Sequence, residues 1–175
     1  MPKTTIASPR LDLPVLTWGA LEALIAGDRQ ALEDATGARF PEPLTAPPLM
    51  EDALPFFRDL VRDGTAGAFG PFLLILRESG EAIGSAGFTG GPNDEGSVLM
   101  GYSVYPAFQG RGFASEAARA LAGWALAQPG IRQVRATIPP DHVASQRVAA
   151  HAGLHRTDRT ETDEDVGLVE VWESG

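Results

Sequence analysis

The segment 101–114, GYSVYPAFQGRGFA, contains the residues whose types and spacing could bind a phosphorylated ligand. A strand pattern ends at Pro106, a loop with Gly110 and Gly112 follows, and a helical pattern then begins. Small residues let the backbone approach a bulky anion, and the unpaired amides of a first helical turn point toward it with the positive end of the helix dipole. Arg111 adds a full positive charge at the same place. The segment therefore predicts a pyrophosphate-binding loop.

Two other phosphate-binding motifs fit this loop less well. Gly110-x-Gly112 begins like a dinucleotide fingerprint, but the third glycine would fall at Ser115, and the motif does not follow the first strand of a βαβ unit. A Walker loop needs Gly-Lys-Ser/Thr, which the segment lacks. A glycine-rich turn that binds nothing is the structural alternative.

The hydrophobic patterns around the loop predict the elements that position it. Strand patterns cover residues 11–15, 69–77, 81–88, 97–104, 133–138 and 168–172, and helical patterns cover 17–35, 50–62, 111–127 and 141–152. Gly27-Asp28 is expected to split the first helix, with Asp28 as the cap of its second half. The proline-rich stretch 40–48 is expected to be a long loop. An antiparallel first half and strand-helix-strand units in the second half predict one α/β domain over residues 1–175.

The same segment resembles the acetyl-CoA-binding motif of the GNAT acetyltransferases, whose signature is Gln/Arg-x-x-Gly-x-Gly/Ala. Here it reads Gln109-x-x-Gly112-x-Ala114. Pro-Arg-Leu at 9–11 and Ala-Ser-x-Arg-Val at 144–148 are similar to the branch that includes the ribosomal-protein-alanine N-acetyltransferases (RimJ/RimL-like). Because the order of the expected elements matches as well, the resemblance covers nearly the whole chain.

The resemblance implies a fold and an activity. The fold would be a single mixed, largely antiparallel sheet of about six to seven strands flanked by helices. The strand containing Ser103 and the strand from Gln133 would run parallel and splay apart, which opens a cleft for acetyl-CoA. The activity would be transfer of the acetyl group to a primary amine, on a protein N-terminus or a small molecule, by direct attack. The acceptor pocket would come from the first helices and the loop 40–48.

The resemblance also implies which residues contact the co-substrate. Backbone groups of Ser103 and Val104 would pair with the pantetheine arm, and the amides from Gln109 to Ala114 would hold the pyrophosphate. The implied cofactor-binding residues are Ser103, Val104, Gln109, Gly110, Arg111, Gly112, Phe113, Ala114, His142 and Ser145.

Two residues are candidates for catalysis. Ser145 matches a serine of the branch that protonates or hydrogen-bonds the CoA sulfur, although its hydroxyl could instead bond a helical carbonyl. His142 stands where the family carries an asparagine that binds the pantetheine, and it could replace the hydrogen bond of that amide, act as a general acid, or simply begin a helix.

The general base is not assigned by the sequence. The family often places a glutamate at the position of Leu99. Asp94 and Glu95 could act through water or could simply be solvated. The substitutions Leu99 and His142 also fit a different class of protein, a non-catalytic acetyl-CoA-binding sensor or regulatory module.

Composition excludes several classes. The formal net charge of −9, from 14 basic and 23 acidic residues, disfavours nucleic acid and mildly favours a cationic amine. The chain has no cysteine, and His151 and His155 are separated by Gly153, so we expect no metal site. No apolar run approaches the ~20 residues of a membrane helix, and there is no secretory signal, so we expect a cytoplasmic protein. A homodimer is common in the family that the chain resembles.

Overall fold

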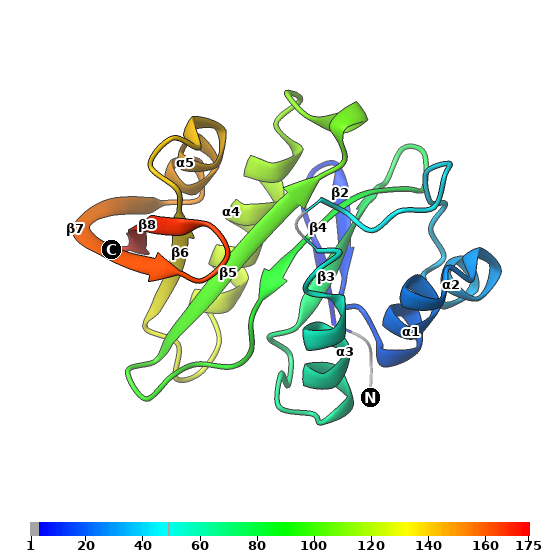
Figure 1. Cartoon of the computed structure of the whole chain (residues 1–175), viewed down its shortest axis with the longest axis horizontal. Helices are drawn as coiled ribbons and strands as arrows, with labels where there is room; N and C mark the ends of the chain where they lie inside the picture. The colour runs from blue at the N-terminus through cyan, green and yellow to red at the C-terminus, as the bar shows by residue number, and fades with distance from the viewer. Residues whose placement is uncertain (1–3, 49) are drawn as a thin grey trace.

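The computed structural model describes residues 4–48 and 50–175 and shows one mixed sheet with helices on both of its faces (Figure 1). The strands are β1 (Thr5–Ala7), β2 (Leu11–Pro14), β3 (Pro71–Leu76), β4 (Glu81–Phe88), β5 (Ser97–Val104), β6 (Gln133–Ile138), β7 (Leu154–Asp163) and β8 (Gly167–Ser174). Their order across the sheet is β1-β2-β3-β4-β5-β6-β8-β7. The pairing is antiparallel except between β5 and β6, which run parallel. The mixed, largely antiparallel sheet is therefore confirmed, with eight strands.

The helices begin and end where capping residues and glycines allow. They are α1 (Trp18–Ala26), α2 (Arg29–Thr36), α3 (Leu54–Arg62), α4 (Phe113–Leu126) and α5 (Val143–His151), with a short 3-10 turn η1 (Pro106–Phe108). Gly27, at φ 69°, ends α1, and the Asp28 side chain accepts a hydrogen bond from the Ala31 amide to cap α2. The predicted split of the first helical segment is confirmed.

Two hydrophobic clusters hold the helices against the sheet. Helix α4 buries Phe113, Ala117, Leu121 and Ala125, a stripe with a spacing of four residues, and the alanines let the helix lie close to the strands. Helices α1 to α3 form the second cluster on the other face, together with Leu73 and Ala82. Strand β3 is buried on both faces because its side chains alternate between the two clusters.

The parallel pair separates after a short contact. Only Ser97, Val98 and Leu99 of β5 are in register with β6, at Gln133, Val134 and Arg135. From Met100 to Val104, β5 is in register with β4 alone. In Figure 1, β5 crosses the front of α4 and ends at the loop that leads into that helix. Among the described residues, one edge of the second half of β5 therefore has no neighbouring strand. A parallel pair that splays apart is what the family resemblance implies.

Three sequence expectations need correction. The helix expected from Met50 begins at Leu54, because Pro55 lacks an amide proton and fits only the first turn of a helix. Strand β1 was missed because it has only three residues. Strand β7 was missed because its sequence, LHRTDRTETD, is polar and mostly exposed, without the apolar alternation of a half-buried strand.

Candidate functional site

The loop from Gly110 to Ser115 presents a row of unpaired backbone amides at the start of α4. Within residues 4–48 and 50–175, no group accepts a hydrogen bond from these six amides. Gly110 and Gly112 hold φ values of 74° and 80°, which an L-residue rarely adopts, so the glycines shape the loop. The amide of Gln109 is already bonded to the Pro106 carbonyl at 3.3 Å. Free amides at the positive end of a 14-residue helix suit an anion.

Two arginines lie beside these amides. The Arg111 guanidinium lies 5.0 Å from the centre of the Phe113 ring, and the Arg10 guanidinium lies 4.3 Å from the same centre. Arg10 also donates from Nη1 to the Arg111 carbonyl at 3.1 Å. A Cβ at Gly112 would lie 3.5 Å from Arg10 Nη2. The loop therefore has a second cation beside it, from a residue 101 positions earlier in the chain, which was not expected from the sequence.

The Glu116 carboxylate, in the first turn of α4, holds Arg10 in place. Glu116 accepts hydrogen bonds from the Ser8 hydroxyl at 2.6 Å, from the Arg10 amide at 2.7 Å and from Arg10 Nε at 2.6 Å. Burial alone would raise the pKa of Glu116, but these hydrogen bonds and the Arg10 charge outweigh it and lower that pKa below its ordinary value. Arg77 stabilises the same turn by donating to the carbonyls of Ser8, Pro9 and Leu11.

The open edge of β5 exposes the backbone of alternate residues. The Leu99 carbonyl accepts from Thr89 and the Tyr105 amide donates to Ile83, so the odd-numbered residues turn their backbone groups toward β4. The Ser103 carbonyl accordingly lies against Gly84 of β4. The backbone groups of Tyr102 and Val104 face the opposite way, into the gap that opens between β5 and β6 beyond Leu99, called the split below. The Val104 carbonyl accepts a hydrogen bond from Gln109 Nε2 at 3.0 Å, which ties the amide loop to the end of the strand.

Tyr102 and Ser145 meet where β5 and α5 face each other. The Tyr102 hydroxyl donates to the Ser145 carbonyl at 2.8 Å and accepts from Ser145 Oγ at 3.1 Å. Burial raises the pKa of Tyr102. Only the contact between a strand residue and a helix residue 43 positions later brings Tyr102 to the site.

His142 is the N-cap of α5. Its Nδ1 accepts a hydrogen bond from the Ser145 amide at 3.1 Å, which satisfies one of the free amides of the first helical turn. His142 thus caps the helix at a position where asparagine is also favoured. His142 also positions Ser145, because it fixes the backbone from which the serine hydroxyl projects.

The acidic candidates lie at the closed end of the split. Asp94 and Glu95 are exposed and precede Ser97, the first residue in register with β6. Tyr102 is seven residues beyond Glu95, about 23 Å along an extended strand. Leu99 faces the opposite side of β5 from Tyr102, because side chains alternate along a strand. Its partner on β6, Arg135, is paired with Glu161 and Glu173.

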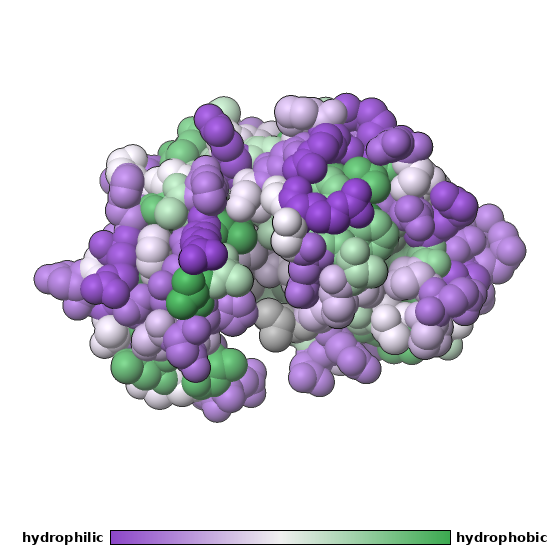
Figure 2. Space-filling view, turned by 90° about the horizontal axis from the view of Figure 1, so that it is seen from above, coloured by the Kyte–Doolittle hydropathy of each residue, from purple (hydrophilic) through white to green (hydrophobic). Residues whose placement is uncertain are grey.

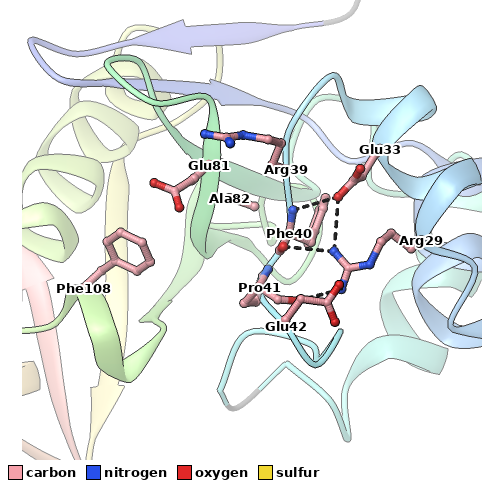
Figure 3. A pocket seen from close by; sticks show the side chains of 9 residues that line it. All are labelled: Arg29, Glu33, Arg39, Phe40, Pro41, Glu42, Glu81, Ala82 and Phe108. Carbon is pink, nitrogen blue, oxygen red and sulfur yellow. Dashed lines mark hydrogen bonds and ion pairs between the residues drawn. The ribbon is translucent and has the colours of Figure 1, made fainter.

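The surface is hollowed above the split. Figure 2 views the molecule from the end at which β5 stops, and a hollow separates the part built from β6, β7 and β8 from the part built from the first helices. A distinct cavity of about 370 Å³ lies between α2, the start of β4 and η1 (Figure 3). There Arg29 pairs with Glu33 and Glu42, and the Glu81 carboxylate points toward Phe108 across the cavity. This cavity contains none of the free amides.

Within the described residues, no group of three or more histidine, aspartate or glutamate side chains is arranged to hold a metal ion. No helix among the same residues has the length and apolar character needed to cross a membrane.

Comparison with known proteins gives a consistent result. The family model described as Acetyltransferase (GNAT) domain matches residues 10–155. A relative from Bacillus subtilis (strain 168), named Uncharacterized N-acetyltransferase YjdG, is 26% identical over 150 residues, which is 83% of this chain and 86% of the relative.

Solved structures show the same fold. An acetyltransferase from Agrobacterium tumefaciens str. C58 aligns with a TM-score of 0.66 at 21% identity, over 100% of this chain and 96% of that one. RimL, a ribosomal L7/L12 alpha-N-protein acetyltransferase in complex with coenzyme A, aligns with a TM-score of 0.67 at 18% identity, over 97% of both chains.

Proposed function

The chain belongs to the GNAT family of acetyl-CoA-dependent acetyltransferases, and from this we propose that it transfers the acetyl group of acetyl-CoA to a primary amine. The observation that carries the proposal is the row of six free amides from Gly110 to Ser115, next to the open edge of β5. When bound, acetyl-CoA supplies a thioester that an amine can attack. The diphosphate of acetyl-CoA matches the free amides, and its extended, amide-containing arm matches the open edge of β5.

The amide loop would hold the diphosphate. The free amides donate hydrogen bonds, the α4 dipole favours the negative charge, and Arg111 adds a positive charge, while Glu116 offsets part of the charge of Arg10. These cations matter more here than in a neutral protein, because a net charge of −9 otherwise repels the phosphates of CoA.

The open edge of β5 would hold the pantetheine arm. Residues whose backbone groups face the split can pair with an amide-containing arm as a strand would. We therefore assign this contact to Val104 and its alternate neighbour Tyr102, since the Ser103 carbonyl is directed toward β4. Holding a thioester and an amine together can contribute about 7–11 kcal/mol to the reaction without a covalent enzyme intermediate.

Ser145 would stabilise the departing sulfur. Its hydroxyl is partly buried at the third position of α5, where the positive end of the helix dipole also favours a thiolate. His142, as the cap, keeps this first turn in place. The amine must arrive without its extra proton, and no carboxylate occupies the position of Leu99 to take it.

The acceptor is expected to be a cationic amine that enters through the hollow in Figure 2. The acidic surface favours such a molecule. RimL carries the name of an alpha-N-protein acetyltransferase, so a protein N-terminus is one acceptor class to test, and small amines are the other.

Calorimetry and thiol release test the proposal together. Because the chain has no cysteine, free CoA can be measured with a thiol reagent without background from the protein. We expect CoA to bind and at least one member of a panel of amines and N-terminal peptides to release thiol above the rate of hydrolysis. CoA binding with no thiol release from any member of the panel would favour the acetyl-CoA sensor, the alternative that Leu99 at the position of the family's glutamate supports. No binding would refute both functions.

A further inference from the structure

The Tyr102 side chain crosses from β5 to α5 at the place where the two parallel strands separate. Its hydroxyl lies 2.8 Å from the Ser145 carbonyl oxygen and 3.1 Å from Ser145 Oγ. A tyrosine hydroxyl has one proton to donate and lone pairs to accept, and a serine hydroxyl has the same. Two oxygens of one residue are thus within reach of a single phenolic proton.

The direction of these hydrogen bonds decides what Ser145 can do. With the Tyr102 proton on the Ser145 carbonyl, the serine proton points to the Tyr102 oxygen and is not available to a ligand. Hydroxyl protons rotate readily. If the Tyr102 proton turns to Ser145 Oγ, the serine hydroxyl becomes an acceptor from Tyr102 and can donate its own proton elsewhere.

We propose that Tyr102 is the positioning residue that lets Ser145 donate a hydrogen bond to the sulfur of acetyl-CoA. The inference rests on the proposed function and adds to it a residue outside α5. Two hydroxyls in a chain polarise each other, so the serine hydrogen bond to a thiolate is stronger when Tyr102 donates to the serine. No covalent bond forms or breaks at Tyr102, and its proton stays on the phenol oxygen.

The protonation state of Tyr102 agrees with this role. Burial raises its pKa, which disfavours the phenolate and keeps the hydroxyl a donor through the neutral range. A residue that holds its proton cannot supply it to the sulfur, but it can orient the hydroxyl that faces the sulfur. The backbone of Tyr102 lies on the open edge of β5, so the same residue borders the arm of CoA.

Tyr105 provides a matched control. Its hydroxyl also donates to a backbone carbonyl, that of Thr45 at 2.6 Å, and burial also raises its pKa. Among the described residues, no serine hydroxyl bonds to it. Tyr102 and Tyr105 are the two tyrosines of the chain, so the pair of single Phe substitutions separates the loss of a buried hydroxyl from the loss of the contact with Ser145.

The kinetic test is a double-mutant cycle with the amine that releases thiol fastest. We expect Tyr102→Phe to lower kcat by about 2- to 10-fold, the loss of one hydrogen bond between uncharged hydroxyls, with the KM for acetyl-CoA changed less than twofold. Tyr102→Phe should have no further effect in Ser145→Ala. Tyr105→Phe frees the Thr45 carbonyl in the loop 40–48, so any change that it makes in kcat should be the same with and without the Ser145 hydroxyl. Additive losses for Tyr102→Phe with Ser145→Ala, or coupling of Tyr105→Phe to Ser145→Ala, would overturn the inference.

A binding test is independent of the acceptor. With tyrosine labelled by ¹³C at Cζ, addition of CoA should shift the signal of Tyr102 more than that of Tyr105, and the Tyr102 shift should become smaller in Ser145→Ala. A Tyr102 signal that moves equally in Ser145→Ala would overturn the inference even where CoA binds. If the wild-type protein releases no thiol but the Ser145-dependent shift is seen, the proposed function fails and the hydroxyl pair stands.

Discussion

Gly112 and Gly130 form a natural pair for testing the amide loop. Gly112 precedes α4 with φ 80°, and Gly130 follows α4 with φ 81°, so an L-residue at either position meets the same backbone cost. That cost is roughly 1–2 kcal/mol, or about 2–8 °C in Tm for a chain of this length. The two glycines lie beyond opposite ends of a 14-residue helix that is about 21 Å long.

The two Trp variants should differ in CoA binding. A Cβ at Gly112 would lie 3.5 Å from Arg10 Nη2, while a Cβ at Gly130 would meet nothing within 4 Å. An indole at position 112 must therefore displace Arg10 or cover the free amides. Losing two charge-assisted hydrogen bonds costs about 3–6 kcal/mol, which is a 100-fold or larger rise in Kd.

Isothermal titration with CoA measures the difference, and thermal unfolding measures the shared cost. We expect Gly112→Trp to lose detectable binding and Gly130→Trp to keep the wild-type Kd, with both variants folded and lower in Tm. Wild-type affinity in Gly112→Trp would refute the amide site. Equal loss in both variants would show that the strained backbone, and not the position of the loop, controls binding.

Three further predictions use the surroundings of the loop. Arg111→Ala should weaken CoA at least threefold more than acetyl-pantetheine, which lacks the diphosphate; equal weakening in calorimetry would remove that role. The folded pKa of Glu116 is lowered, so its ionised carboxylate stabilises the fold above the ordinary glutamate pKa, and this stabilisation is lost as pH falls below about 4. Glu116→Gln should therefore make Tm depend less on pH below about 4. The same fall in Tm with acid as in the wild type would contradict this. At pH 8, His142→Ala should cost about 1 kcal/mol and His142→Asn only a few tenths, measured by denaturant unfolding; equal costs would show that Nδ1 is not the cap.

Local patterns predicted the elements well where burial is regular. The bounds of β4, β5 and β6 agree with expectation residue for residue, because each strand has apolar side chains packed against α4. The turn at Gly27-Asp28 could also be predicted, since a left-handed glycine and a capping aspartate depend only on neighbouring residues. Strand β7 was not readable, because it is held by its ladder with β8 and by ion pairs such as Arg156 with Glu170, which depend on a partner strand.

The candidate site divides in the same way. The amide loop, Arg111 and the family membership follow from residues that are adjacent in the chain, where spacing alone sets the geometry. The tertiary structure alone places Arg10 beside Gly112 and Tyr102 against Ser145. It also shows that the Ser103 carbonyl faces β4, so that the backbone groups of Tyr102 face the open edge. The physical reason is that strand alternation and strand order determine which side chains and backbone groups face each other across the split, and neither is written in the spacing of residues along one segment.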